Sequence, residues 1–362
     1  MTHQPETTVF FVTINGGTSG TVSVPHGAPE EDERVLVRTH LRSHFGWRIE
    51  DIVLASYERG NYVVSFDSAT SKFIRSCSVS KANTQSERKT VHRELWQYIN
   101  RNKIHELDIR AIYSHFGITT IGTNSFQNCA SLTTICIPEG VTAIDEGAFA
   151  GCTALTTVCI PDGVTAIENG VFGGCTALTT ICIPEGVTAI GKGAFYNCRA
   201  LTTVTIPDSV TGIGEYAFCG CAALTTVNIP DSISTIGCRV FAACTSLCTL
   251  TLPDGVTTIG TNSFQNCASL TTICIPEGVT AIDEGAFAGC TALTTICIPD
   301  GVTAIGKGAF YNCRALTTVT IPDSVTSIGS HAFWGCALLT SHPFTLCNVR
   351  TIENPLHGIP SY

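Results

Sequence analysis

A unit of 23 residues recurs along most of this sequence. The motif Phe-x-x-Cys appears ten times at this constant interval, with its phenylalanines at Phe126, Phe149, Phe172, Phe195, Phe218, Phe241, Phe264, Phe287, Phe310 and Phe333. A fixed period of this length is typical of stacked supersecondary units, each of which buries its apolar face only against its neighbours. Residues 118–340 are therefore predicted to form one elongated solenoid of ten 23-residue repeats.

One repeat, residues 187–209, shows how the unit is expected to fold. Val187 begins a short extended segment, which two closely spaced glycines end. Ala194, Phe195, Cys198 and Leu201 then follow the spacing of one apolar helical stripe. This spacing predicts a helix of about two turns, which is too short to be stable without its neighbours.

The end of the repeat reads as a β-strand. Val204 and Ile206 alternate with Thr203 and Thr205, so the first pair is expected to face inward and the second outward. A Pro-Asp/Glu-Gly/Ser turn leads into the next repeat. Stacking aligns nine outward threonines of successive repeats in a ladder, namely Thr134, Thr157, Thr180, Thr203, Thr226, Thr249, Thr272, Thr295 and Thr318.

This threonine ladder is the candidate binding site. Threonine is also simply a favourable residue on the solvated face of a sheet, where cross-strand pairs stabilise slightly. The functional interpretation is a flat, uncharged, polar strip that recognises a partner protein. An ice-binding face is a third interpretation, but cysteine interrupts the second outward column at five of nine positions.

The repeat motif Val-Thr-x-Ile-Gly-x-x-Ala-Phe-x-x-Cys-x-x-Leu-Thr-x-Ile-x-Ile-Pro-x-Gly/Ser resembles that of the BspA-like, or treponemal-type, leucine-rich repeat family. The resemblance covers about 220 of the 362 residues. It implies a right-handed β-solenoid with a parallel sheet and short helical turns. It also implies a non-enzymatic, protein-binding role, which in bacterial surface members is adhesion to host matrix proteins.

Charge is distributed unevenly along the chain. Residues 1–117 carry 14 Lys+Arg and 13 Asp+Glu, whereas residues 118–340 carry 5 and 15. A solenoid so poor in basic residues cannot neutralise many phosphates, so we expect no nucleic-acid partner and no binding to anionic lipid. The repeats are also nearly identical: residues 119–167 and 257–305 differ at one position, and residues 187–211 recur at 302–326.

Catalytic and metal-binding residues are scarce in the repeats. The solenoid contains a single histidine, His331, with no base beside a nucleophile. Near the N-terminus, His40 and His44 lack the glutamate of a His-Glu-x-x-His zinc site, because Leu41 follows His40. The sequence predicts no enzyme activity, no cofactor and no metal site, although an enzyme with its site in the N-terminal head is an alternative.

The repeated cysteines are expected to be reduced thiols. Ten belong to Phe-x-x-Cys and are predicted to be buried as small apolar side chains. Five more follow the threonine ladder by two residues and are predicted to be exposed, namely Cys136, Cys159, Cys182, Cys274 and Cys297. A linear column of thiols does not converge on a metal as the four ligands of a zinc site must.

Residues 1–82 are predicted to form a small α+β head. Two hairpins, 9–24 and 52–66, flank an amphipathic helix at 32–45, and this order fits a β-grasp unit. Residues 83–117 are expected to form a helical linker that also caps the N-terminal end of the solenoid. In this linker, Thr84 and Glu87 have capping-box spacing before a helix that buries Val91, Leu95, Tyr98 and Ile99, and residues 105–115 complete the cap. Residues 341–362 are predicted to cap the other end.

The leading hypothesis is a cytoplasmic, non-enzymatic scaffold that binds another protein through the outward sheet face. The first residues lack the segments of a signal peptide, and no stretch approaches the roughly 18 apolar residues of a membrane helix. The main alternative is an exported adhesin that binds host or matrix proteins, for which an extracellular location is required. The identity of the partner is not predicted.

Overall fold

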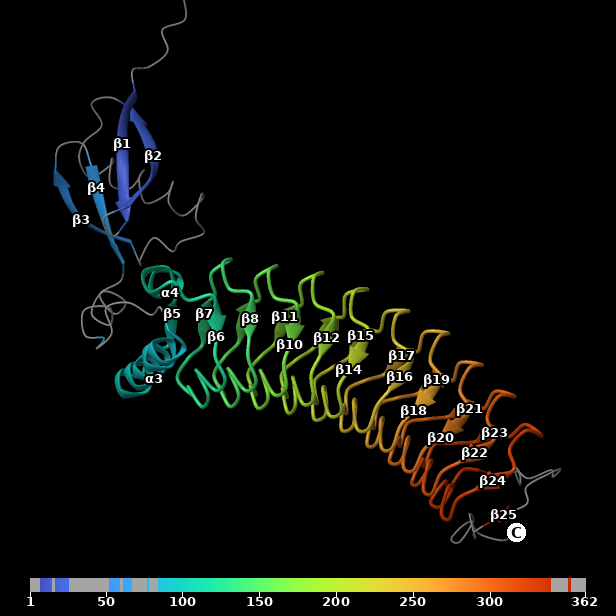
Figure 1. The fold of residues 1–362 in the computed structure, drawn as a ribbon. Coiled ribbons are helices and arrows are strands. Elements are labelled where there is room, and N and C mark those ends of the chain that lie inside the picture. The colour runs from blue at the N-terminus through green and yellow to red at the C-terminus, as the bar shows by residue number, and fades with distance from the viewer. Residues whose placement is uncertain are drawn as a thin grey trace, which may run out of the picture. The chain divides into compact units, whose positions relative to one another are not determined.

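The computed structural model describes the backbone of residues 7–14, 17–25, 52–58 and 61–66, residue 77, the continuous segment 84–339 and residues 351–352. Side chains are described for residue 77 and for residues 84–339 apart from Ala111. The chain divides into two compact units, Met1–Ser80 and Lys81–Tyr362. Figure 1 shows the elements of each unit.

The first unit contains a four-stranded sheet. Its strands are β1 (Thr7–Ile14), β2 (Gly17–Pro25), β3 (Ile52–Glu58) and β4 (Asn61–Phe66). They pair in the order β2-β1-β4-β3, with two antiparallel hairpins at the edges and a parallel β1–β4 pair in the centre. Both predicted hairpins are confirmed, and this order is that of a β-grasp sheet. The helix expected at 32–45 lies outside the described residues, so the β-grasp assignment stays a prediction.

The second unit begins with the helix α3 (Gln85–Asn102). The predicted capping box is present: the Thr84 hydroxyl accepts from the Glu87 backbone N–H at 3.2 Å, and the Thr84 N–H donates to Glu87 Oε2 at 2.8 Å. The inward face buries Val91, Leu95 and Ile99 completely. The prediction that Tyr98 is buried is wrong, because this side chain is half-exposed.

The segment after α3 forms part of the solenoid itself. The strand β5 (Glu106–Asp108) pairs in parallel with the first sheet strand of the repeats, and the helix α4 (Arg110–Phe116) follows it. Only the second half of the segment 105–115 is therefore helical. The first half extends the sheet by one strand, because its backbone lies where a preceding repeat would place its own strand.

Each repeat contributes two short strands to two parallel rows (Figure 1). The three-residue strands are β7 (Thr134–Cys136), β9 (Thr157–Cys159), β11 (Thr180–Cys182), β13 (Thr203–Thr205), β15 (Thr226–Asn228), β17 (Thr249–Thr251), β19 (Thr272–Cys274), β21 (Thr295–Cys297) and β23 (Thr318–Thr320). The two-residue strands are β6 (Thr120–Ile121), β8 (Ala143–Ile144), β10 (Ala166–Ile167), β12 (Ala189–Ile190), β14 (Gly212–Ile213), β16 (Thr235–Ile236), β18 (Thr258–Ile259), β20 (Ala281–Ile282), β22 (Ala304–Ile305), β24 (Ser327–Ile328) and β25 (Thr351–Ile352). Threonine pairs with threonine from one turn of the solenoid, or rung, to the next. The predicted parallel β-solenoid is confirmed.

The predicted two-turn helix of each repeat is wrong. Between the two strands the chain makes a run of tight turns whose N–H groups alternate in their acceptors. Tyr196 N–H bonds to Gly193 O within its own rung, whereas Phe195 N–H bonds to Ala217 O of the next rung. Gly193 and Asn197 have φ values of 60° and 56°, which no α-helix contains. The inter-rung bonds thus replace the i to i−4 ladder of a helix.

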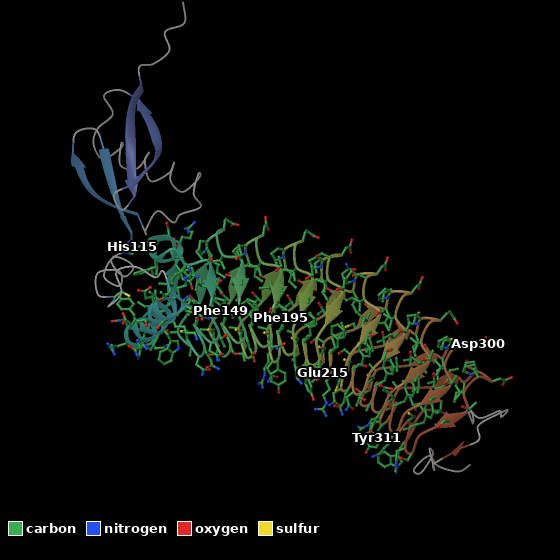
Figure 2. The ribbon with its side chains drawn as sticks, in the orientation of Figure 1. His115, Phe149, Phe195, Glu215, Asp300 and Tyr311 are labelled. Carbon is green, nitrogen blue, oxygen red and sulfur yellow. The ribbon has the colours of Figure 1, made fainter. Side chains whose placement is uncertain are left out.

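The core consists of columns of identical side chains. Successive phenylalanine rings stack nearly parallel, for example Phe195 on Phe218 with centroids 5.2 Å apart, and these rings are fully buried. Figure 2 labels Phe149 and Phe195 of this column. Each motif cysteine is also buried. From Cys152 onward its thiol donates to the carbonyl of the phenylalanine one rung earlier, as Cys221 does to Phe195 O at 3.2 Å. Phe-x-x-Cys therefore specifies both a ring stack and an inter-rung hydrogen bond.

At the C-terminal end, β25 pairs in parallel with β24 and adds one more strand to the two-residue row. The remainder of the predicted cap, residues 340–350 and 353–362, lies outside the described residues. The boundaries 82/83, 117/118 and 340/341 stay predictions.

Candidate functional site

The candidate site is the outward face of the three-residue strands. Eight of the nine ladder threonines are exposed, and Thr134 at the capped end is half-buried. The central residue of every one of these strands points inward and is buried. The predicted alternation is thus present along the whole row, and it brings the nine threonines into one column, apart from an interruption in the strand pairing between Thr226 and Thr249.

The ladder threonines differ from the threonines that precede them. Thr202 Oγ1 donates to Thr179 O of the previous rung at 3.3 Å, and Thr225 Oγ1 donates to Thr202 O at 3.1 Å. Within the described part of the chain, the ladder hydroxyls form no such bond. The preceding column is therefore used to hold rungs together, whereas the ladder column presents donors and acceptors to solvent.

The second outward column changes along the solenoid. Cys159 and Cys182 are exposed and pair in register, and Cys274 and Cys297 repeat this arrangement near the other end. Between these pairs the column reads Thr205, Asn228 and Thr251. The middle of the face thus carries only hydroxyl and amide groups, and thiols lie on both sides of it.

A hollow of about 450 Å³ lies over this middle region. It spans β13, β15 and β17, where the hydrogen-bonded row divides into two sheets between β15 and β17. Thr226 and Asn228 lie at its centre, and Asp231 lies at its edge. The sequence signal for this feature is the loss of cysteine from the second outward column in three consecutive repeats, which by itself does not predict a recess.

A row of carboxylates borders the threonine face. The turn after each three-residue strand carries one exposed acidic residue, and the nine are Glu139, Asp162, Glu185, Asp208, Asp231, Asp254, Glu277, Asp300 and Asp323. The basic residues of 118–339 are Lys192, Arg199, Arg239, Lys307 and Arg314, and none occupies a sheet or acidic-turn position. The face and its border therefore have negative potential without neutralising partners in the same rows.

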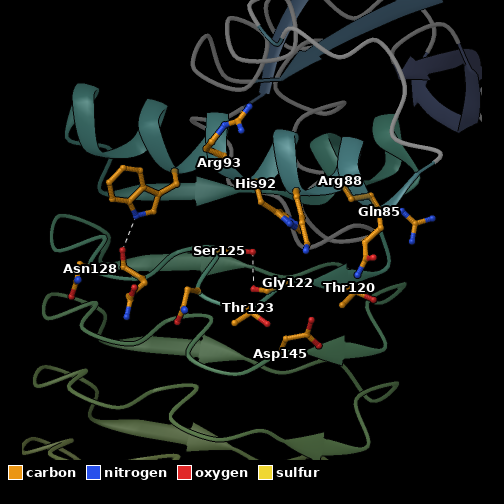
Figure 3. Close-up of a pocket in the computed structure, with 14 residues that line it drawn as sticks. Gln85, Arg88, His92, Arg93, Thr120, Gly122, Thr123, Ser125, Asn128 and Asp145 are labelled. Atoms are coloured by element: carbon orange, nitrogen blue, oxygen red, sulfur yellow. Dashed lines mark hydrogen bonds between the residues drawn. The ribbon is translucent and has the colours of Figure 1, made fainter.

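A second hollow, of about 640 Å³, lies between α3 and the first rungs (Figure 3). Arg88, Lys89 and Arg93 line it from the helix, and Asp145 lines it from the solenoid. Trp96 closes one end, where its Nε1–H donates to Gln127 O at 2.6 Å. The three cations give this hollow a basic wall on the helix side, which the repeat pattern does not predict because α3 lies outside the repeats.

The histidine of this second hollow is a structural group. His92 is buried and its Nε2 lies 2.8 Å from the Tyr113 hydroxyl. Burial lowers the pKa of His92 to about 4 and raises the pKa of Tyr113 well above its ordinary value. The arrangement joins α3 to α4, which contains Tyr113. The candidate histidines of the head, His40 and His44, lie outside the described residues.

Two absences concern the described residues alone. No group of three His, Cys, Asp or Glu side chains there is placed to hold a metal ion. No helix there is both long and apolar enough to cross a membrane.

Comparison with known proteins identifies the repeats. A family model for the BspA type leucine-rich repeat region matches residues 97–225 and 211–340. Similar solved structures include a leucine-rich repeat protein from Bacteroides ovatus ATCC 8483, at 27% identity over 62% of this chain and 82% of the other, with a TM-score of 0.39. Another is a leucine-rich cell surface protein from Faecalibacterium prausnitzii A2-165, at 29% identity over 68% and 86%, with a TM-score of 0.44. The leucine-rich repeat protein of T. pallidum shows 27% identity over 53% and 78%, with a TM-score of 0.41. No curated protein matches the chain.

Proposed function

Because the chain belongs to the BspA-type leucine-rich repeat family, we propose that it is a non-enzymatic scaffold that binds a partner protein through its threonine face. Repeat solenoids of this kind offer extended surfaces that suit protein recognition. The near identity of the repeats also favours an extended contact over catalysis, since an active site needs a single arrangement of unlike groups.

The observation that carries this proposal is the column of exposed ladder threonines without internal hydrogen bonds. Neighbouring threonines such as Thr202 and Thr225 have their hydroxyls committed to the previous rung. A partner that meets the ladder therefore finds hydrogen-bonding groups that the fold does not need. The hollow around Thr226 and Asn228 supplies the recess in which a central side chain of the partner is received.

The charge of the border favours a partner with a basic contact surface. One carboxylate per rung flanks the face, and this row contains no lysine or arginine. Complementary potentials raise association rates and exclude partners of like charge. We expect the affinity to fall as the salt concentration rises, because the flanking pairs are exposed to solvent.

For its location we propose the cytoplasm. Cys159 and Cys182 are exposed and adjacent in register, as are Cys274 and Cys297, and thiols in such positions persist in a reducing compartment. The alternative is an exported adhesin that binds host or matrix proteins. Localisation of a C-terminally tagged copy in its native cell separates the two, since secretion or surface display would contradict the cytoplasmic proposal.

The binding face is tested by partner capture from native extracts with two matched triple variants of the full chain. Thr203→Lys, Thr226→Lys and Thr249→Lys place three charges on the threonine face. Ala189→Lys, Thr235→Lys and Thr258→Lys place the same charges at exposed positions of the two-residue row. We expect the first variant to lose the captured protein and the second to retain it. Equal retention by both variants would exclude the threonine face as the binding surface.

A further inference from the structure

Two aromatic rings stack on each other in the last rungs, in the tight turns that lie between the two strands of each repeat. Tyr311 and Trp334 have centroids 4.8 Å apart and planes inclined by 12°, and both are half-exposed. Figure 2 shows Tyr311 at the opposite edge of the solenoid from Asp300, which belongs to the acidic row. The pair therefore lies away from the threonine face, and the proposed protein-binding function does not use it.

A hollow of about 620 Å³ adjoins this pair, within the range of small-molecule sites. Its lining combines small residues with polar and aromatic ones. Ala288 is one of the small residues, and Asn262, Gln265, Glu284, Lys307 and Tyr311 are among the larger ones.

The repeat register shows a position in this hollow where a column of larger side chains is interrupted, and we call this position the gap. Gln265, Ala288, Tyr311 and Trp334 are equivalent positions of four successive rungs, since each is 23 residues after the one before. Ala288 interrupts the column between a long amide side chain and the aromatic pair. A flat ring placed over Ala288 would lie one rung from Tyr311 and would extend the existing stack by one member.

The polar groups around the gap indicate the chemistry of that ring. Asn262 and Gln265 each offer an amide oxygen and an amide NH₂, which together match a hydroxyl that both donates and accepts. Glu284 Oε1 and Lys307 Nζ lie 3.8 Å apart, so the charged groups at the rim balance each other. A phosphate or carboxylate would find no excess positive charge here, and a purely apolar ring would leave the amides unpaired.

We propose that this hollow binds a neutral carbohydrate, with one pyranose ring stacked on Tyr311 over Ala288. The ring's C–H face contacts the aromatic surface, and its hydroxyls bond to Asn262, Gln265 and the Glu284–Lys307 pair. Trp334 backs Tyr311 on the other side and holds its ring parallel to the rungs.

The sequence assembles this combination once. Residues 257–305, with Asn262, Gln265 and Ala288, adjoin a copy of the repeat that carries Tyr311. In the first half of the chain the equivalent blocks, 119–167 and 187–211, are separated by an additional repeat. That repeat has Gly173 at the position equivalent to Tyr311. Tyr196, the counterpart of Tyr311, is followed one rung later by Cys219 rather than by tryptophan.

The test uses the full chain and a panel of neutral oligosaccharides built from glucose, galactose, mannose and N-acetylglucosamine. Each sugar is titrated while the tryptophan fluorescence is recorded, with Trp334→Phe identifying the contribution of Trp334. We expect saturable binding of at least one sugar. Tyr311→Ala should weaken it about tenfold or more, whereas Tyr196→Ala should leave it unchanged.

A second variant protects the test against a folding defect. Ala288→Tyr fills the gap with the residue that two other rungs carry at this position, so the solenoid is expected to fold and the sugar to be displaced. Absence of binding across the panel would overturn the proposal, as would binding that Ala288→Tyr and Tyr311→Ala both leave intact. Preference for AMP or a sialylated sugar over every neutral one would also overturn it.

Discussion

At the scale of single residues, Ser263 is the one buried side-chain oxygen without a partner within residues 84–339. Its sequence context is identical to that of Ser125, whose hydroxyl donates to Gly122 O at 2.7 Å. Other rungs have alanine at this position, as at Ala217. We expect Ser263→Ala to stabilise the protein by about 1 kcal/mol, because it removes an unsatisfied buried hydroxyl. Thermal unfolding checks this, and Ser125→Ala, which loses a real hydrogen bond, should give no gain.

Phe218 is the residue on which the packing of the central rungs depends. Its ring is fully buried and stacks on Phe195 and Phe241 at 5.2 and 5.6 Å. Phe218→Ala leaves a cavity that a column held at both ends cannot close, so we expect a loss of about 3 to 5 kcal/mol. Denaturant unfolding measures this loss, with Thr226→Ala on the exposed ladder as the control. The control should change the free energy of unfolding little. An unchanged midpoint for Phe218→Ala would show that the column is not packed.

At the scale of the element, the tight turns depend on pairs of residues on adjacent rungs. Six asparagines with positive φ are each followed one rung later by glycine, and a Cβ on that glycine would overlap the asparagine Oδ1. The six pairs are Asn124/Gly147, Asn128/Gly151, Asn197/Gly220, Asn262/Gly285, Asn266/Gly289 and Asn312/Gly335. Asparagine at such a turn position thus requires glycine in the next repeat.

This pairing predicts a coupling between Asn197 and Gly220. Gly220→Ala is destabilising for two reasons, its φ of 79° and the overlap with Asn197. Asn197→Gly removes only the overlap, so the double variant should recover part of the loss, with a coupling energy of about 1 kcal/mol. Urea unfolding of the four proteins measures it. Strictly additive effects would show that the asparagine side chain moves aside at no cost.

The sequence predicted some elements well because their signals are local. The alternation of apolar and polar residues around Val204 predicts the three-residue strands correctly. The capping-box spacing of Thr84 and Glu87 predicts where α3 begins. The expected helix at Ala194–Leu201 failed, since apolar spacing does not reveal that every second N–H bonds to the next rung. β5 was missed because three residues become a strand only when another strand is present beside them.

The candidate sites also differ in how far the sequence predicts them. The threonine ladder follows directly from the repeat period, and the structure exposes it as expected. The hollow beside Tyr311 depends on how unlike neighbours combine across rungs. A comparison of equivalent positions in adjacent repeats, such as Ala288 before Tyr311, contains that signal in the sequence.

The docking of α3 should weaken in acid because of His92. Its pKa is lowered from an ordinary 6.5 to about 4, so between these values the unfolded chain binds a proton that the folded chain does not. The contribution is fully present above pH 6.5 and is lost as the pH falls toward 4, by about 3 kcal/mol in total. His92→Gln, which keeps a partner for Tyr113, should have a smaller loss of stability over this range in urea unfolding. Equal pH profiles would assign the acid sensitivity to other groups.

At the scale of the whole molecule, stability is a sum of rungs and of contacts between neighbouring rungs. In this arrangement any property repeated at one position accumulates along the stack. The phenylalanine and cysteine columns accumulate stabilisation in this way. The acidic row accumulates repulsion, because its like charges recur at about the 4.8 Å spacing of parallel strands.

The acidic row therefore predicts an unusual response to salt. Residues 118–340 carry 15 acidic and 5 basic residues, and nine of the acids share one edge. Raising NaCl from about 10 mM to about 200 mM shortens the screening length from about 30 Å to less than 10 Å, so the thermal midpoint should rise. A triple variant that combines Asp208→Asn, Asp231→Asn and Asp254→Asn lacks three of these charges. Its thermal midpoint at low salt should already be higher than that of the unmodified protein, and the midpoint should rise less when salt is added. A midpoint that is insensitive to salt in both proteins would show that repulsion along the row is relieved by other means.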